Sequence, residues 1–234
     1  MYGEDLIVYK FGGLVLQEEK KVVEVIKDGI NKYQKVIVVV SAIGRLYSPY
    51  STDTLYSMCK NTSEKEISRM VSCGEIISSV IVSNLLRSNG INSISVSLYE
   101  IDLNYNGGFM MNDYIKESLE KYDVIIVPGF LGLKNNEIVL LERGGSNITA
   151  SYLASHFNSE LVIFTDVDGI YLNDPKIDIN AIKIKRMTYE TLKEITKDNQ
   201  KLFPLEGIKY LETSNVKVLI RNLYSNEGTI IERF

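Results

Sequence analysis

The chain has 234 residues, of which 45% are hydrophobic and 24% charged, and its formal net charge is −4. This length and composition exclude a disordered chain and indicate one domain, of one or two lobes, with a full core. Acidic and basic residues are interspersed without a basic face, which argues against nucleic acid and anionic membranes as partners.

The first part of the chain alternates apolar strands with amphipathic helices. Residues 6–9 read as a buried strand ending at the motif Lys10-Phe11-Gly12-Gly13, and residues 17–33 carry apolar side chains at helical spacing. Residues 35–41 predict a second buried strand, and the polar stretch 44–52 predicts a surface loop over its end. The elements expected next are one or two helices over 64–88, a strand over 91–96, an irregular region over 98–112, a helix over 114–120 and a strand over 124–127.

The second part continues the alternation. A hairpin with its turn at Asn135-Asn136 leads to the motif Arg143-Gly144-Gly145, after which Ser146 or Asn147 is expected to cap a helix reaching Phe157. A strand over 161–165 runs into an acidic loop, and the remaining elements are helices over 188–197 and 204–212 and strands over 217–220 and 229–231. This order predicts an α/β fold with a mainly parallel sheet and helices on both faces.

Three glycine motifs indicate binding chemistry. Lys10 followed by Gly12 and Gly13 offers a positive charge and close backbone donors at a strand end, which suits a polyphosphate. The motif is neither a Walker A loop nor a dinucleotide fingerprint, and alone it is weak. Arg143 before paired glycines adds a second anion site, and Glu75 in SCGE could hold an ammonium group.

Taken together, several motifs resemble the catalytic domain of aspartate kinases over nearly the whole chain. They are KFGG, VVVSAIGR with YSTDTL, SCGEIISS, VPGFLG, ERGGSNITA, FTDVDGIYLNDPK and VLIRNLYSNEGTII. The resemblance implies the amino-acid kinase fold, a three-layer αβα sandwich similar to carbamate kinase. It implies a single domain over 1–234, with a substrate lobe over roughly 1–140 and a nucleotide lobe over roughly 141–234.

The activity that the resemblance implies is Mg·ATP-dependent phosphorylation of the aspartate β-carboxylate, the first step toward lysine and related amino acids. Mg²⁺ would be held mainly by the nucleotide phosphates, with no metal site on the protein. The family's C-terminal regulatory modules are not in this sequence, so insensitivity to lysine, threonine and methionine is expected. By analogy, the partners besides aspartate and ATP would be a second copy or a separate regulatory subunit.

Site residues follow from the matching motif positions. The catalytic set implied is Lys10, Asn147 and Lys201. The substrate set is Ser41, Thr52, Glu75, Arg143 and Gly144. The nucleotide set is Gly12, Gly13, Thr165, Asp166, Tyr171, Pro175 and Lys176. The chain's one histidine, His156, is expected to be structural, because an ionised acceptor carboxylate needs no strong general base.

The chain departs from the family pattern at three places. Leu14 and Val15 stand where the family has Thr-Ser, Asn147 replaces an aspartate thought to hold the two lysines, and the stretch after Lys201 lacks a polar residue and an arginine. A degenerate binding or regulatory protein is therefore an alternative, as is a kinase acting on another small acid or on a nucleotide. A haloacid-dehalogenase-like interpretation of VIFTDVDGIY is weaker, because that strand normally opens its domain.

The location of the chain is inferred from its cysteines and apolar runs. Cys59 and Cys73 lie outside metal-ligand spacing and fit a reduced protein better than a disulfide framework. The sequence shows no signal-peptide pattern at its start, and its apolar runs, such as 36–40, have the length of strands. We therefore expect a cytoplasmic protein.

Overall fold

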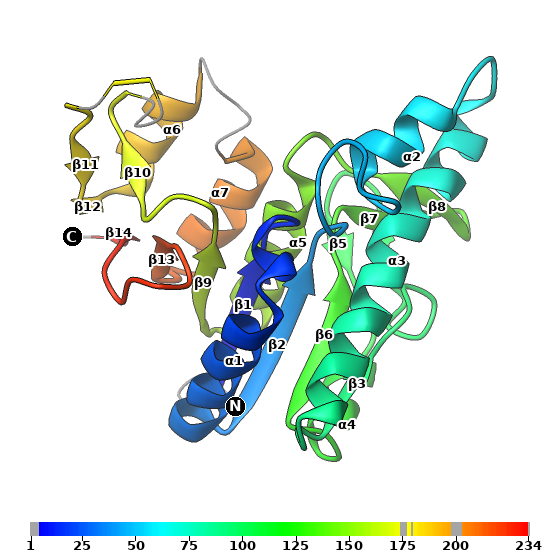
Figure 1. The fold of residues 1–234 in the computed structure, drawn as a ribbon, viewed down its shortest axis with the longest axis horizontal. Coiled ribbons are helices and arrows are strands. Elements are labelled where there is room, and N and C mark those ends of the chain that lie inside the picture. Colours follow the sequence, from blue (N-terminus) through cyan, green and yellow to red (C-terminus); the bar gives the residue numbers. More distant parts are fainter. Residues whose placement is uncertain (1–4, 174–176, 179, 198–202, 234) are drawn as a thin grey trace.

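A computed structural model describes residues 5–173, 177–178, 180–197 and 203–233. Its centre is an eight-stranded sheet with the order β12-β14-β13-β9-β1-β2-β6-β3 (Figure 1). Every neighbouring pair is parallel except β13 and β14, which confirms the predicted mainly parallel α/β fold. The strands are β1 (Leu6–Phe11), β2 (Lys35–Val40), β3 (Ser93–Ser95), β6 (Val124–Pro128), β9 (Glu160–Phe164), β12 (Arg186–Met187), β13 (Val218–Arg221) and β14 (Thr229–Ile231).

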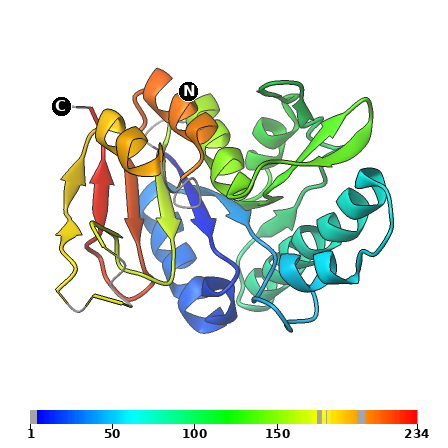
Figure 2. The ribbon, with the colours of Figure 1, turned by 90° about the horizontal axis from the view of Figure 1, so that it is seen from above.

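Helices pack on both faces of this sheet (Figure 2). One face carries α1 (Glu19–Tyr33) and α3 (Glu64–Ser88), with the short η1 (Val15–Gln17) before α1. The other face carries α4 (Tyr114–Leu119), α5 (Gly145–Phe157), α6 (Tyr189–Lys197) and α7 (Leu205–Thr213). The remaining helix, α2 (Thr52–Met58), packs beside α3.

Two hydrophobic cores form, one on each face of the sheet. Strand β2 shows why, because Ile37 and Val39 belong to the core under α5 while Val36, Val38 and Val40 belong to the core under α1 and α3. A strand buried on both faces is apolar at every position, and such a run in the sequence is typical of a parallel sheet.

The layer formed by α1 and α3 is incomplete. These helices lie over the β1, β2, β6 and β3 half of the sheet, and no described helix covers β13 and β14 on that side (Figure 2). Leu219 and Ile230 on this bare face are only partly buried. The expected helices on both faces are therefore present for only part of the sheet.

Two smaller sheets extend the fold. The first has the order β5-β4-β7-β8, formed by β4 (Asn104–Tyr105), β5 (Phe109–Met110), β7 (Leu131–Lys134) and β8 (Glu137–Leu140), and the second pairs β10 (Ile170–Tyr171) with β11 (Lys183–Ile184). The predicted hairpin turn is confirmed: Asn135 and Asn136 have positive φ values of 52° and 61° between β7 and β8. Residues 98–112, expected to be irregular, contain β4 and β5, whose pairing with a distant strand has no local signal.

Helix α3 is one continuous helix of 25 residues. Among the described residues it is the helix whose length and composition would let it cross a membrane, but half of its most apolar window is buried inside the fold. It packs against β6 and β3. A core helix of a globular domain passes the same test, so this is weak support for a membrane span.

Candidate active site

Several of the side chains expected to bind ligand lie at the carboxyl ends of the central strands. Strand β1 reaches Phe11, so Lys10 lies within it rather than after it, opposite Val39 of β2 and Ile163 of β9. Because side chains alternate along a strand, Lys10, Ser41 and Thr165 are on the α5 side of the sheet. Ligands of open α/β sheets bind at this edge.

Lys10 is poorly solvated, and burial lowers the pKa of its ammonium group to about 8. No carboxylate forms an ion pair with Lys10 among the described residues, so no anion offsets this desolvation. A partly buried ammonium group without a counter-ion is suited to bind an arriving phosphate.

The second of the paired glycines after Lys10 is required by close backbone packing. A Cβ on Gly13 would lie 2.2 Å from the carbonyl oxygen of Ala42. The carbonyl of Gly13 also accepts a hydrogen bond from Gly44 N–H at 2.9 Å, and Gly12 N–H donates to the Phe164 carbonyl at 3.1 Å. The turn therefore ties the end of β1 to the loop after β2.

Glu75 lies under the same loop. Its side chain is 1% exposed, its Oε1 accepts a hydrogen bond from the Thr52 hydroxyl at 3.2 Å, and its Oε2 has no partner. Burial raises the pKa of the Glu75 carboxyl to about 7, although hydrogen bonds from Thr52 and from the Ala42 backbone oppose the rise. The glycine before it is also required, because a Cβ on Gly74 would lie 2.4 Å from the Tyr50 carbonyl oxygen. The unpartnered Oε2 is thus available to a hydrogen-bond donor of a ligand.

Helix α5 begins two or three residues earlier than predicted. Its N-cap is Gly144, with φ of 87° and no side-chain cap, whereas Ser146 and Asn147 were expected to be the capping residues. Ser146 is instead engaged with Ser41, their hydroxyl oxygens lying 3.0 Å apart. Asn147 is 9% exposed and its Oδ1 has no hydrogen-bond partner. The free N–H groups of the first helical turn suit an anion, and Asn147 is a neutral group beside them.

The loop after β9 meets the loop after β2. Asp166 accepts a hydrogen bond from Thr165 at 3.2 Å and forms an ion pair with Arg45 at 3.4 Å. The sequence motifs assigned no role to Arg45. Its position in the loop that follows Ser41 is the signal that could have identified it as a site residue. Tyr171 is on strand β10 and donates to Asp168 at 2.5 Å.

Some predicted site residues are not joined to this cluster. Arg143 is exposed and has no ion pair or hydrogen bond with any described residue. Pro175, Lys176 and Lys201 lie outside the described residues. The predicted roles of these four residues stay predictions.

Leu14 and Val15, which stand where the family pattern has Thr-Ser, differ in environment. Val15 is 6% exposed and packs in the core under α1, while Leu14 is only half-buried. Val15 therefore faces the core, whereas Leu14 is partly exposed in the turn after β1.

Within the part of the chain that the structure describes, no group of three His, Cys, Asp or Glu side chains could hold a metal ion. The ammonium group of Lys10 and the backbone N–H of Gly13 fit the phosphates of a nucleotide, whereas the N–H of Gly12 is already bonded to the Phe164 carbonyl. That magnesium is held mainly by the nucleotide phosphates stays a prediction.

A lysine and backbone donors at the carboxyl ends of parallel strands make this an α/β protein with a candidate phosphate-binding site. The sequence profile of the amino acid kinase family matches residues 5–222, and the chain belongs to this family. It is 30% identical over 249 aligned residues to aspartokinase 1 of Bacillus subtilis, which covers 97% of this chain and 60% of that protein. The chain thus spans less than two thirds of the length of this relative.

Solved structures share the fold. The E. coli aspartokinase III in complex with aspartate and ADP superimposes with a TM-score of 0.80 at 19% identity, covering 97% of this chain and 64% of that one. The UMP kinase of Ureaplasma parvum superimposes with a TM-score of 0.72 at 20% identity, covering 97% and 98%. At these identities the likeness concerns the fold, which different kinases share.

Proposed function

We propose that this chain is an ATP-dependent kinase that phosphorylates the β-carboxylate of aspartate, with a transfer rate reduced by Asn147 and Leu14. The observation that carries the proposal is the buried carboxylate of Glu75, held by Thr52 with one oxygen free, at the same sheet edge as Lys10. The site thus offers an anionic group for an amino group and a cationic group for phosphates. The similarity to aspartokinases supports the same acceptor.

This arrangement gives each residue of the site a proposed role. Lys10 and the backbone N–H of Gly13 would hold the transferring phosphates, with Gly12 lining them. Asp166 and Tyr171 would lie toward the nucleoside. Glu75 would take the α-ammonium of aspartate, with Ser41 and Thr52 beside it and Arg143 as the clamp for a carboxylate. Because the acceptor is already ionised, charge neutralisation and positioning would supply most of the catalysis.

The test is a coupled assay with aspartate and Mg·ATP in which hydroxylamine traps the acyl phosphate, run beside calorimetric ATP binding. Aspartyl hydroxamate formation that depends on aspartate supports the proposal. Glu75→Gln should raise the KM for aspartate at least tenfold with little change in ATP affinity, because a charged hydrogen bond is worth about 1.5–3 kcal/mol. Glu64→Gln, at the exposed start of α3, is the matched control and should change neither.

A degenerate binding or regulatory protein is the second candidate, because Asn147 leaves Lys10 without a carboxylate neighbour. It predicts ATP binding without hydroxamate formation. A kinase for another small acid or for a nucleotide predicts turnover with that acceptor instead, and Glu75 favours an acceptor bearing an amino group.

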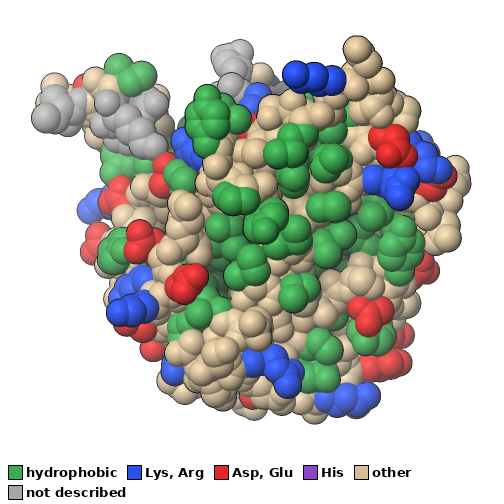
Figure 3. Space-filling model, turned by 45° about the vertical axis from the view of Figure 1, so that its right-hand side comes forward, with side chains coloured by type: hydrophobic (Ala, Val, Ile, Leu, Met, Phe, Trp, Pro, Cys, Tyr) green, Lys and Arg blue, Asp and Glu red, His purple; other side chains and the backbone are tan. Residues whose placement is uncertain are grey.

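Self-association through α3 is part of the same proposal. Along residues 70–86 the helix carries one charged side chain, the buried Glu75, and it exposes Met70, Ile76, Val80 and Ile81. Hydrophobic side chains gather on the face of the molecule that Figure 3 shows. A contiguous apolar surface of this kind favours a protein contact. Sedimentation of wild type as a dimer and of Val80→Glu as a monomer supports a contact between two copies.

A further inference from the structure

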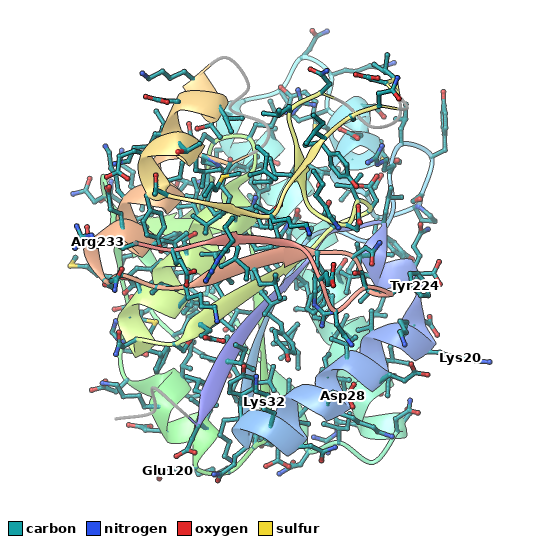
Figure 4. All side chains as sticks on the ribbon, turned by 90° about the vertical axis from the view of Figure 1, so that its left-hand side faces the viewer. Lys20, Asp28, Lys32, Glu120, Tyr224 and Arg233 are labelled. Carbon is teal, nitrogen blue, oxygen red and sulfur yellow. The ribbon has the colours of Figure 1, made fainter. Side chains whose placement is uncertain are left out.

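A groove of about 840 Å³ lies on the bare face of the sheet, opposite the face that carries Lys10. Its floor is formed by β1, β9, β13 and β14, and its wall is the side of α1 that carries Asp28 and Lys32 (Figure 4). Tyr224, in the loop between β13 and β14, lies at one end (Figure 4). The groove is separate from the proposed kinase site and independent of the proposed function.

The floor of the groove is apolar, and helices normally cover parallel strands at such a place. Val162, Leu219 and Ile230 line it, and Leu219 and Ile230 are only partly buried. Parallel strands are ordinarily covered on both faces by helices, so β9 and β13 with one bare face lack part of a layer. The groove runs beside α1 from Lys21 to Lys32, which at the rise of an α-helix is a length of about 16 Å. That length fits a helix of about three turns.

The rim is positively charged. Seven lysine and arginine side chains line the groove against three aspartate and glutamate side chains. Lys217 is paired with Glu160, and Lys183 is paired with Asp168. Lys32 and Lys185 are exposed and form no ion pair with a described carboxylate. Part of the positive charge is thus available to a partner.

Arg221 is the strongest sign of a missing anion. Its guanidinium stacks over the ring of Phe164 at 4.8 Å and donates to the Ser225 carbonyl at 2.5 Å, but its buried Nε has no acceptor. No described carboxylate forms an ion pair with it. A partly desolvated guanidinium without a counter-ion is costly, and a partner carboxylate would remove that cost.

We propose that this groove is a docking surface for an acidic amphipathic helix of another polypeptide. The apolar face of that helix would pack on Leu219 and Ile230 and complete the missing layer. Its carboxylates would pair with Lys32, Lys185 and Arg221 along the rim. Charge complementarity and the length of the groove favour this occupant over a small anion, which would leave most of the apolar floor exposed.

The probe is a capped 14-residue peptide with leucines at i, i+3, i+4 and i+7 and glutamates on the flanks of that stripe. A control peptide has lysine in place of every glutamate. Anisotropy titration of the full chain at low salt gives the affinity, and hydrogen exchange locates the bound peptide. The expected result is binding of the acidic peptide with protection of residues 25–32 and 218–231, and at least tenfold weaker binding of the basic peptide.

Two variants of the chain complete the test. The double variant Lys32→Glu with Lys185→Glu alters only exposed side chains, so its melting temperature should equal that of wild type. Its affinity for the acidic peptide should be about tenfold lower. Met110→Glu, at an exposed position of β5 outside the groove, should leave binding unchanged. Equal binding of both peptides, no protection of the groove at millimolar acidic peptide, or protection by inorganic phosphate alone would overturn the proposal. Protection of the groove by a second copy of the chain in the absence of peptide would also overturn it.

Discussion

The guanidinium of Arg45 forms an ion pair with the carboxylate of Asp166 at 3.4 Å and so links the loop after β2 to the loop after β9. These loops follow strands on either side of β1, whose Lys10 lies between them in the sheet. The pair thus spans the edge at which the substrate and nucleotide residues are proposed to meet. It places a second positive charge beside the proposed phosphate site.

Arg45→Ala should weaken Mg·ATP binding about threefold to tenfold while changing stability by less than about 1 kcal/mol. The stability effect is small because both side chains are partly exposed, and exposed pairs contribute little. The binding effect arises because a cation near the phosphates is lost, and it should shrink at high salt. Arg69→Ala is the matched control, since Arg69 is equally exposed and pairs with Glu66 along α3. An ATP affinity for Arg45→Ala equal to that of the control would show that Arg45 does not act on the nucleotide.

Mg·ATP should raise the melting temperature of the chain, and Lys10→Ala should remove most of that rise. A ligand present at 100 times its dissociation constant stabilises a protein by about 2.7 kcal/mol. Because the pKa of Lys10 is lowered to about 8, its positive charge and its contribution to phosphate binding should be lost as pH rises through 8. Thermal shift measurements at pH 7 and pH 9, with Lys20→Ala on the exposed side of α1 as the control, check both effects. A melting temperature that saturating Mg·ATP leaves unchanged would count against a nucleotide site.

Glu75 should make the stability of the chain depend on pH. Its carboxyl has an ordinary pKa of 4.5 when unfolded and about 7 when folded, so the folded state favours the protonated form. The resulting stabilisation is fully present below pH 4.5 and is lost as pH rises through 7. Glu75→Gln should therefore unfold at higher denaturant concentration than wild type at pH 8, with a smaller or reversed difference at pH 5. A difference that is constant across this range would contradict the raised pKa.

The carboxyl of Glu75 should also make aspartate binding depend on pH, but here the effect is favourable at high pH. An ammonium group is bound by the ionised carboxylate, so the KM for aspartate should fall as pH rises from 6 to 8. Aspartate itself keeps its charges over this range. Glu75→Gln should flatten the profile, and an unchanged profile in that variant would assign the pH dependence to another group.

Asn147→Asp should raise the transfer rate by roughly 10- to 100-fold while changing ATP affinity little. A carboxylate accepts charged hydrogen bonds worth about 1.5–3 kcal/mol, and the Oδ1 of Asn147 has no partner in the fold. The new charge near Lys10 should also raise the pKa of that lysine. The measurement is the hydroxamate rate at saturating substrates, with Asn158→Asp at the other end of α5 as the control.

Leu14→Thr should add to that gain, and more than additively, because both changes act on the same phosphates. Single and double variants compared in one rate cycle test this. Background rates in both Asn147→Asp and the double variant, in protein that still binds ATP, would exclude a weakened aspartate kinase and leave a different acceptor or a binding protein.

The sequence by itself determined the elements whose signal is local. The run 36–40 is apolar at every position because both faces of β2 are buried, and Asn135-Asn136 predicts its turn because both residues adopt positive φ. Motif resemblance gathered Lys10, Glu75 and Thr165 into one expected site. Tertiary structure decided which side chains share a face, because this depends on strand register, and β1 continues to Phe11 through its pairing with β2 and β9. It also decided the raised pKa of Glu75, the contact between Arg45 and Asp166, and the bare face at Leu219, because each depends on which distant segments lie over a residue and which do not.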